Sequence, residues 1–169
     1  VNVWSKILSS VRNSKLILKT SNVRASNLLI SKFKNENVLD SVEFLSFEKD
    51  FKSHMNSYQK IDIALDTFPY TGVTTSFEAI WMGVPVLTMK GFNFQSRCGE
   101  SINKNLDLNC LCAENAEDYI FKAKELSQNK DFIFELRKKL FDNALVSPLF
   151  DTSLFAKDFF KTLELINKQ

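Results

Sequence analysis

A few polar residues within seven positions carry the side chains that a phosphorylated ligand needs. Gly72 lacks a Cβ atom and lets the backbone come close to a phosphate, and the hydroxyls of Thr74 and Thr75 add hydrogen-bond donors. Thr74 and Glu78 are four residues apart, so on a helix they share one face. The spacing predicts anion binding by the glycine and the threonines, with Glu78 holding another part of the same ligand.

The residues around this cluster predict a strand, a turn, a helix and a second strand. The apolar run at residues 61–65 is typical of a buried parallel strand. Thr75 and Glu78 have the spacing of a capping box, Gly83 ends the helix, and residues 86–89 form the next strand. Ligands of parallel sheets bind beyond the carboxyl ends of the strands, where a helix start offers free N–H groups. The same residues also fit a purely structural role, in the turn, the cap and the box.

Hydrophobic periodicity extends this alternation along the chain. It predicts, in order, a helix at 3–13, a strand at 16–19, a helix at 23–35, a strand at 42–46, a helix around 51–58, the unit described above, a loop at 90–101 with Ser101 as a possible helix cap, a strand at 108–112, and helices at 116–127, 131–146 and 151–167. Residues 1–169 are therefore expected to form one α/β domain: a Rossmann-like parallel sheet flanked by helices, with a helical C-terminal tail. Because the chain opens with valine inside a helical pattern, we expect a fragment that lacks its first strand.

Composition and charge narrow the function. Apolar residues make up 44% of the chain and charged residues 25%, and the net charge of +2 is scattered, which gives no case for nucleic acid. No apolar run is long enough to cross a bilayer, so we expect no membrane association and a cytoplasmic location. Cys98, Cys110 and Cys112, with His54 as the single histidine, lack the paired spacing of a zinc site. We expect reduced thiols and no metal.

Two further residues are candidates for ligand contact. Arg97, in the loop at 90–101, can clamp a phosphate bidentately, but beside Glu100 it also fits a surface ion pair. His54, on a predicted helix, taken by itself fits a solvated or core residue better than a ligand contact. No pair of carboxylates and no Ser/His/Asp set suggests an acid–base apparatus, so we predict no catalytic residue and no hydrolysis.

Two motifs carry a family resemblance. LDTFPYTGVTT at residues 65–75 and AIWMGVPVLT at residues 79–88 resemble the O-linked N-acetylglucosamine transferase family, including its SPINDLY-like members. Similar residues recur in the same order at Gly91, Ser96-Arg97, Ala113-Glu114, Asp118-Tyr119 and Ser147 to Asp151. The resemblance therefore covers nearly the whole chain.

This resemblance implies the C-terminal, nucleotide-sugar-binding half of a GT-B glycosyltransferase, with the acceptor-binding half upstream in the same polypeptide. It implies an inverting transfer from a UDP-sugar, less favourably a GDP-sugar, to a protein or glycan hydroxyl, without a metal or other cofactor. By the same resemblance Thr74 and Thr75 contact the diphosphate, Glu78 holds the ribose hydroxyls and His54 lies beside the base. Glu78 departs from an aspartate of animal members, and Val73 replaces a histidine.

Other functions stay open at this point. The chain also fits a non-catalytic nucleotide-binding or protein-interaction module derived from the same fold. A receiver-like signalling domain fits less well, because the early acidic cluster that binds its metal is lacking. Since half of the cleft would lie outside the chain, we expect these residues alone to bind nucleotide weakly and to transfer no sugar.

Overall fold

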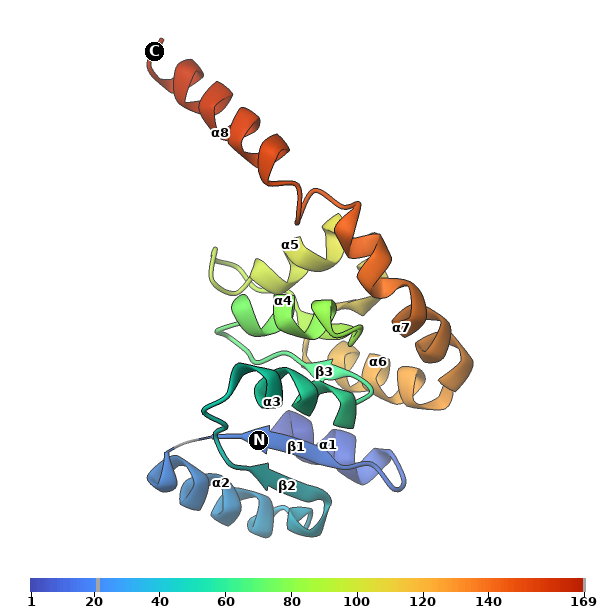
Figure 1. Ribbon diagram of the computed structural model, residues 1–169. Helices are drawn as coiled ribbons and strands as arrows, with labels where there is room; N and C mark the ends of the chain where they lie inside the picture. The colour runs from blue at the N-terminus through green and yellow to red at the C-terminus, as the bar shows by residue number, and fades with distance from the viewer. Residues whose placement is uncertain (21, 169) are drawn as a thin grey trace.

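A computed structural model describes residues 1–20 and 22–168 of the 169-residue protein (Figure 1). Its helices and strands, in chain order, are α1 (Asn2–Ser10), β1 (Leu16–Lys19), α2 (Val23–Asn35), β2 (Val42–Leu45), α3 (Phe51–Asn56), β3 (Ala64–Leu65), α4 (Thr74–Trp81), β4 (Val86–Met89), α5 (Cys98–Asn105), β5 (Cys112–Ala113), α6 (Ala116–Gln128), α7 (Lys130–Leu145) and α8 (Thr152–Ile166). Short 3-10 helices are η1 (Leu39–Ser41), η2 (Ser57–Lys60) and η3 (Asn109–Leu111). The predicted alternation of helices and strands is confirmed.

Several predicted boundaries agree because local signals set them. β1 and α2 have the predicted bounds, and the side chain of Asn22 caps α2 by accepting a hydrogen bond from the Ala25 amide. Gly83 follows the end of α4 with a φ of 69°, and the amide of the next residue, Val84, donates to the Ala79 carbonyl at 2.8 Å. This is a Schellman motif, in which glycine tolerates the left-handed backbone.

Other boundaries differ from the prediction. The strand expected at 61–65 is reduced to β3. The strand expected at 108–112 is mostly the 3-10 helix η3, and β5 begins only at its last residue. Ser101 lies inside α5 rather than at its start, so its predicted role as a cap is wrong. These segments are short, and pairing with a neighbouring strand decides where each strand begins.

The parallel strands lie in two sheets instead of one. β1 pairs with β2, and β3, β4 and β5 pair in that order, all in parallel. Between the two sheets lies a cavity of about 1240 Å³, whose walls include Leu18 of β1 and Leu65 of β3. Ala64 and Asp66 donate backbone hydrogen bonds toward the β4 side. Because successive residues of a strand point their backbone groups to opposite sides, Leu65 directs its own toward this cavity.

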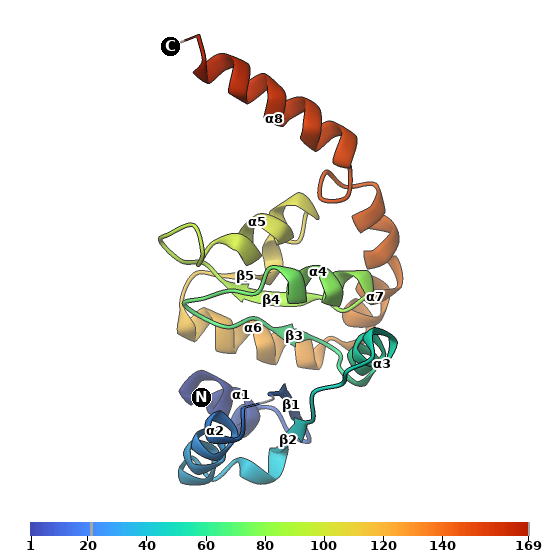
Figure 2. The same ribbon diagram turned by 60° about the vertical axis from the view of Figure 1, so that its left-hand side comes forward.

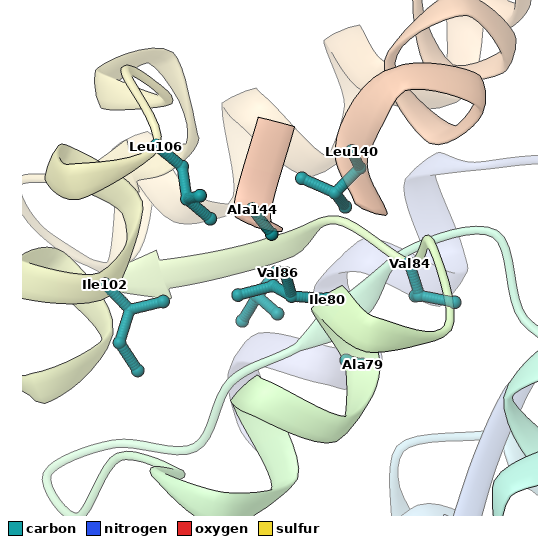
Figure 3. Packing of buried hydrophobic residues seen from close by; sticks show 8 residues of the cluster. All are labelled: Ala79, Ile80, Val84, Val86, Ile102, Leu106, Leu140 and Ala144. Atoms are coloured by element: carbon teal, nitrogen blue, oxygen red, sulfur yellow. The ribbon is translucent and has the colours of Figure 1, made fainter. Parts of the chain in front are cut away.

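The largest buried cluster fixes the orientation of α4. Eight buried side chains from α4, β4, α5, α7 and the turns beside them pack together (Figure 3), and they are Ala79, Ile80, Val84, Val86, Ile102, Leu106, Leu140 and Ala144. Ala79 and Ile80 are fully buried, so one face of α4 is committed to this core. Thr74 lies on the opposite face, and it is exposed together with Thr75 in the first turn, so both are left for solvent or a ligand.

The C-terminal helix α8 extends away from the body of the molecule (Figures 1 and 2). None of its residues is buried, and the rings of Phe155 and Phe159 stack with centroids 5.9 Å apart. The predicted helical tail is confirmed. No helix in the described part of the chain has the length and apolar character needed to cross a membrane.

Candidate functional site

Asp66 organises the loop at the carboxyl end of β3. Its Oδ1 accepts hydrogen bonds from the amides of Thr67 at 2.9 Å and Gly72 at 2.7 Å, and its Oδ2 accepts from Thr88 Oγ1 at 2.7 Å. Burial raises the pKa of this carboxyl above its ordinary range, against the opposing effect of the Gly72, Thr88 and Thr67 donors. The carboxylate thus folds the loop back onto β4.

The loop is tied to a second loop and to a buried glycine. Thr71 Oγ1 donates to the carbonyl of Gln95 at 2.7 Å, which joins the loop after β3 to the loop after β4. Gly99, at the start of α5, packs so closely on Thr88 and Asp66 that a Cβ atom there would overlap with both side chains. Gly72 is likewise close to the Thr75 side chain. Both glycines therefore serve close packing within the site.

The predicted capping box at the start of α4 is wrong. Val73 is the residue before the helix, and no side chain caps it. Instead of turning back to the helix start, the Glu78 carboxylate reaches across to α3 and η2. The Gly72 amide is occupied by Asp66, so the donors left for an anion are the first N–H groups of α4 and the exposed hydroxyls of Thr74 and Thr75.

A chain of polar contacts joins Lys19 at the end of β1 to Glu78 on α4 through His54 on α3. Lys19 Nζ lies 3.0 Å from Glu48 Oε2 and 2.9 Å from His54 Nδ1. His54 Nε2 lies 3.0 Å from Glu78 Oε2, and Tyr58 OH donates to the same oxygen at 2.9 Å. Burial, and then the bond to Glu78 and its charge, raise the pKa of the Tyr58 hydroxyl, which therefore remains a donor at neutral pH. His54 and Glu78, predicted as separate ligand contacts, are thus direct partners.

Arg97 forms the ion pair with Glu100 that the sequence offers as the alternative to a phosphate contact. Its Nε lies 2.8 Å from Glu100 Oε2, and Lys104 Nζ lies 2.8 Å from Glu100 Oε1. Hydrogen bonding by Lys104, and to a smaller degree by Arg97, lowers the pKa of the buried Glu100 carboxyl. The Arg97 side chain is still 48% exposed, and its two terminal nitrogens make no hydrogen bond within the described residues.

The structure brings together most of the predicted site residues. Gly72, Thr74 and Thr75 lie at the carboxyl edge of β3, and Glu78 follows one turn along α4 with His54 beside it. Arg97 belongs to the neighbouring loop that Thr71 anchors. Sequence reasoning missed Asp66, Lys19 and Tyr58. Asp66 and Lys19 could have been found, because polar residues at the carboxyl ends of parallel strands lie at the edge of the sheet where ligands bind.

Within residues 1–20 and 22–168, no group of three or more His, Cys, Asp or Glu side chains is arranged to hold a metal ion. Cys98, Cys110 and Cys112 are free, and burial raises the pKa of the Cys112 thiol.

The fold and the site define an α/β domain of the Rossmann-like class, with polar side chains gathered beyond the parallel strands. Comparison with known proteins narrows this class. The chain belongs to glycosyl transferase family 41, whose family model matches residues 1–159. The family resemblance predicted from the two motifs is thereby confirmed.

Named relatives and a solved structure agree with this membership. The chain is 33% identical, over 168 residues, to the probable UDP-N-acetylglucosamine–peptide N-acetylglucosaminyltransferase SPINDLY of Eustoma exaltatum subsp. russellianum, covering 94% of this chain and 18% of that protein. It is 30% identical to the UDP-N-acetylglucosamine–peptide N-acetylglucosaminyltransferase of Giardia intestinalis, covering 85% of this chain and 10% of that protein. It also matches a lysine-to-methionine mutant of the Thermobaculum terrenum O-GlcNAc transferase, with a TM-score of 0.85 and 29% identity over 95% of this chain and 32% of that one. The α/β fold class is confirmed, and the chain corresponds to a small part of these longer proteins.

Proposed function

We propose that this chain is the donor-binding part of an inverting glycosyltransferase that moves a sugar, most simply N-acetylglucosamine from UDP-N-acetylglucosamine, to hydroxyl groups of proteins or glycans. The names of the similar proteins support this donor and a peptide acceptor. The observation that carries the proposal is the start of α4, where Thr74 and Thr75 are exposed beside uncapped N–H groups and Glu78 lies on the same helix. A GDP-sugar is the less favoured donor.

Each site residue has a role in this proposal. Thr74, Thr75 and the first amides of α4 bind the diphosphate, since a helix start favours negative charge. Glu78 accepts hydrogen bonds from the ribose hydroxyls. Both ring nitrogens of His54 are engaged by protein, so the imidazole offers the base its ring surface. The free terminal nitrogens of Arg97 add a second contact for the anion.

The chemistry expected of this part is stabilisation of the departing nucleoside diphosphate. Donors aimed at the charge that develops on a leaving group lower the barrier to transfer. Val73 offers only an apolar side chain at the start of α4, so the hydroxyls of Thr74 and Thr75 carry more of this task. No residue of this chain is assigned as a catalytic acid or base, and no metal or cofactor is part of the proposal.

Calorimetry with uridine and guanosine diphosphate tests this function. Substituting Thr74 and Thr75 together by valine should weaken binding, because each hydrogen bond to a charged group contributes about 1.5–3 kcal/mol. Thr162→Val, on the distant helix α8, is the matched control and should bind as the wild type does. Equal affinity of the double variant and the wild type would contradict the assignment of Thr74 and Thr75 as diphosphate contacts. Binding without any transfer by the longer parent protein would instead favour the non-catalytic module.

We further propose that these residues are one domain of a longer polypeptide, and that one more strand lies between β1 and β3. Within the described residues β1 pairs only with β2, and β3 only with β4, and the cavity between them has apolar walls from both sheets. A strand there would give the order of a doubly wound sheet, in which ligands bind where the strand order reverses. That point adjoins Asp66 and the start of α4.

The free thiols support a cytoplasmic location for the protein, which we also propose.

A further inference from the structure

The carboxylate of Glu78 has one oxygen occupied and one open. Oε2 accepts from His54 Nε2 at 3.0 Å and from Tyr58 OH at 2.9 Å, which uses both of its lone pairs. Oε1 makes no hydrogen bond to any residue that the structure describes, and the Glu78 side chain is 19% exposed. Oε1 is therefore the oxygen left for a ligand hydroxyl, while Oε2 is held by the protein.

His54 is itself held from its second nitrogen. The Lys19 ammonium has only donors and the Glu78 carboxylate has only acceptors, so Nδ1 of His54 accepts and Nε2 carries the proton. We assign the neutral tautomer on this ground, since a charged imidazole would direct an N–H group at the ammonium. Glu48 fixes Lys19 from its other side at 3.0 Å.

Tyr58 acts on Glu78 directly. Its hydroxyl donates to Glu78 Oε2, and it also lies 3.3 Å from the Thr75 carbonyl at the start of α4. The rings of Tyr58 and His54 pack edge to face with centroids 5.8 Å apart, so each restricts the other. α3, which carries His54, lies between the β1–β2 pair and α4 (Figures 1 and 2). The Glu78 carboxylate is thus braced by α3 and η2 directly, and by β1 through His54.

We propose that Tyr58 and Lys19 are positioning residues for the ribose contact of Glu78, Tyr58 by holding the carboxylate directly and Lys19 by holding it through His54. This inference rests on the proposed nucleotide-binding function. A carboxylate without these partners would divide among several rotamers and lose the contact with the two ribose hydroxyls. Among the described residues, the hydroxyls of Thr74 and Thr75, which are the proposed diphosphate contacts, make no hydrogen bond to the brace, and Tyr58 reaches only the Thr75 carbonyl. Loss of Tyr58 or of Lys19 should therefore weaken recognition of the two ribose hydroxyls and leave the diphosphate contacts in place.

The test compares uridine diphosphate with 2′,3′-dideoxyuridine diphosphate in calorimetry, or the guanosine pair if guanosine diphosphate binds more tightly. The wild type should prefer the ligand with hydroxyls by about tenfold or more, the effect of a charge-assisted hydrogen bond. In Tyr58→Phe and in Lys19→Met the preference should fall to within about threefold, with the affinity for the dideoxy ligand retained. Lys19→Arg still presents donors to His54 and Glu48 and should keep the preference. Lys122→Met, which breaks a comparable ion pair with Asp118 on α6, should keep it too.

Nitrogen NMR provides a second readout that a general loss of stability would not reproduce. His54 is the only histidine, so ¹⁵N-histidine labelling reports a single imidazole. We expect a protonated Nε2 and an unprotonated Nδ1 in the wild type, and a displaced Nδ1 resonance in Lys19→Met but not in Lys122→Met. An unchanged preference for the hydroxylated ligand in both Tyr58→Phe and Lys19→Met would overturn the positioning role. Absence of nucleotide binding by the wild type would overturn the proposed function itself, and the two failures are distinguished because the second appears without any substitution.

Discussion

Removal of the Asp66 carboxylate should destabilise the chain more than any change at a neighbouring exposed carboxylate. Asp66→Ala leaves the half-buried Gly72 amide and the fully buried Thr88 hydroxyl without their acceptor, while the exposed Thr67 amide can turn to water. Each unsatisfied buried group costs about 1–3 kcal/mol, and the desolvation that raises the Asp66 pKa offsets part of this loss. We expect a fall of about 2–4 kcal/mol in the free energy of unfolding.

Asparagine at the same position separates geometry from charge. Its carbonyl oxygen can still accept from Thr67 and Gly72, and its amide can donate to Thr88, whose hydroxyl also accepts. Asp66→Asn should therefore lose only about 1 kcal/mol. Urea unfolding at neutral pH measures all three proteins, with the exposed Asp62→Ala as the control, which should stay within about 0.5 kcal/mol of the wild type. If Asp66→Ala is no less stable than Asp66→Asn, or if both variants are as stable as the wild type, Asp66 is not the acceptor on which Gly72 and Thr88 depend.

Three further predictions concern packing, pH and the gap between the sheets. Gly99→Ala should lower the free energy of unfolding by about 1–3 kcal/mol, because its Cβ would overlap with Thr88 and Asp66, whereas Ser101→Ala on the exposed side of the same helix should be nearly neutral in the same urea experiment. The lowered pKa of Glu100 means that its stabilising contribution is present above the ordinary glutamate pKa of about 4.3 and is lost as pH falls through its folded-state pKa. Glu100→Gln should therefore shrink the drop in Tm between about pH 6 and about pH 3, and Glu135→Gln, in an exposed ion pair, should leave that drop as in the wild type. A short valine–isoleucine strand joined ahead of α1 should raise the Tm by filling the cavity between β1 and β3, whereas the same segment with a central proline should not. A rise of the same size with the proline segment would contradict pairing as the cause.

Glu78 shows where local sequence patterns stop being informative. Its spacing from Thr75 fits a capping box, and the same residue in the folded chain binds His54 and Tyr58 instead. Either arrangement gives the Glu78 carboxylate hydrogen-bond donors, and only the position of α3 relative to α4 decides which of the two forms. A sequence pattern of four residues carries no information about how these two helices pack against each other.

Arg97 and His54 show the same limit from the side of the ligand. The sequence is compatible with either a phosphate clamp or an ion pair with Glu100 for Arg97, and the structure shows the ion pair, with both terminal nitrogens making no hydrogen bond to any residue it describes. His54 was assigned beside a base only by family resemblance. Its partners Lys19 and Glu78 lie 35 and 24 residues away in the chain, so no local signal names them.

The sequence by itself determined the order of helices and strands, the bounds of β1 and α2, the glycine that ends α4, and the family. These features depend on hydrophobic period, backbone propensity and short motifs, all of which act between near neighbours. The tertiary structure alone decided that the strands form two sheets, that Asp66 holds the loop after β3, and that Lys19, His54, Tyr58 and Glu78 form one connected group. The physical reason is that strand pairing and buried hydrogen bonds select partners by distance in space, and only the packing of the core brings those distant groups within reach.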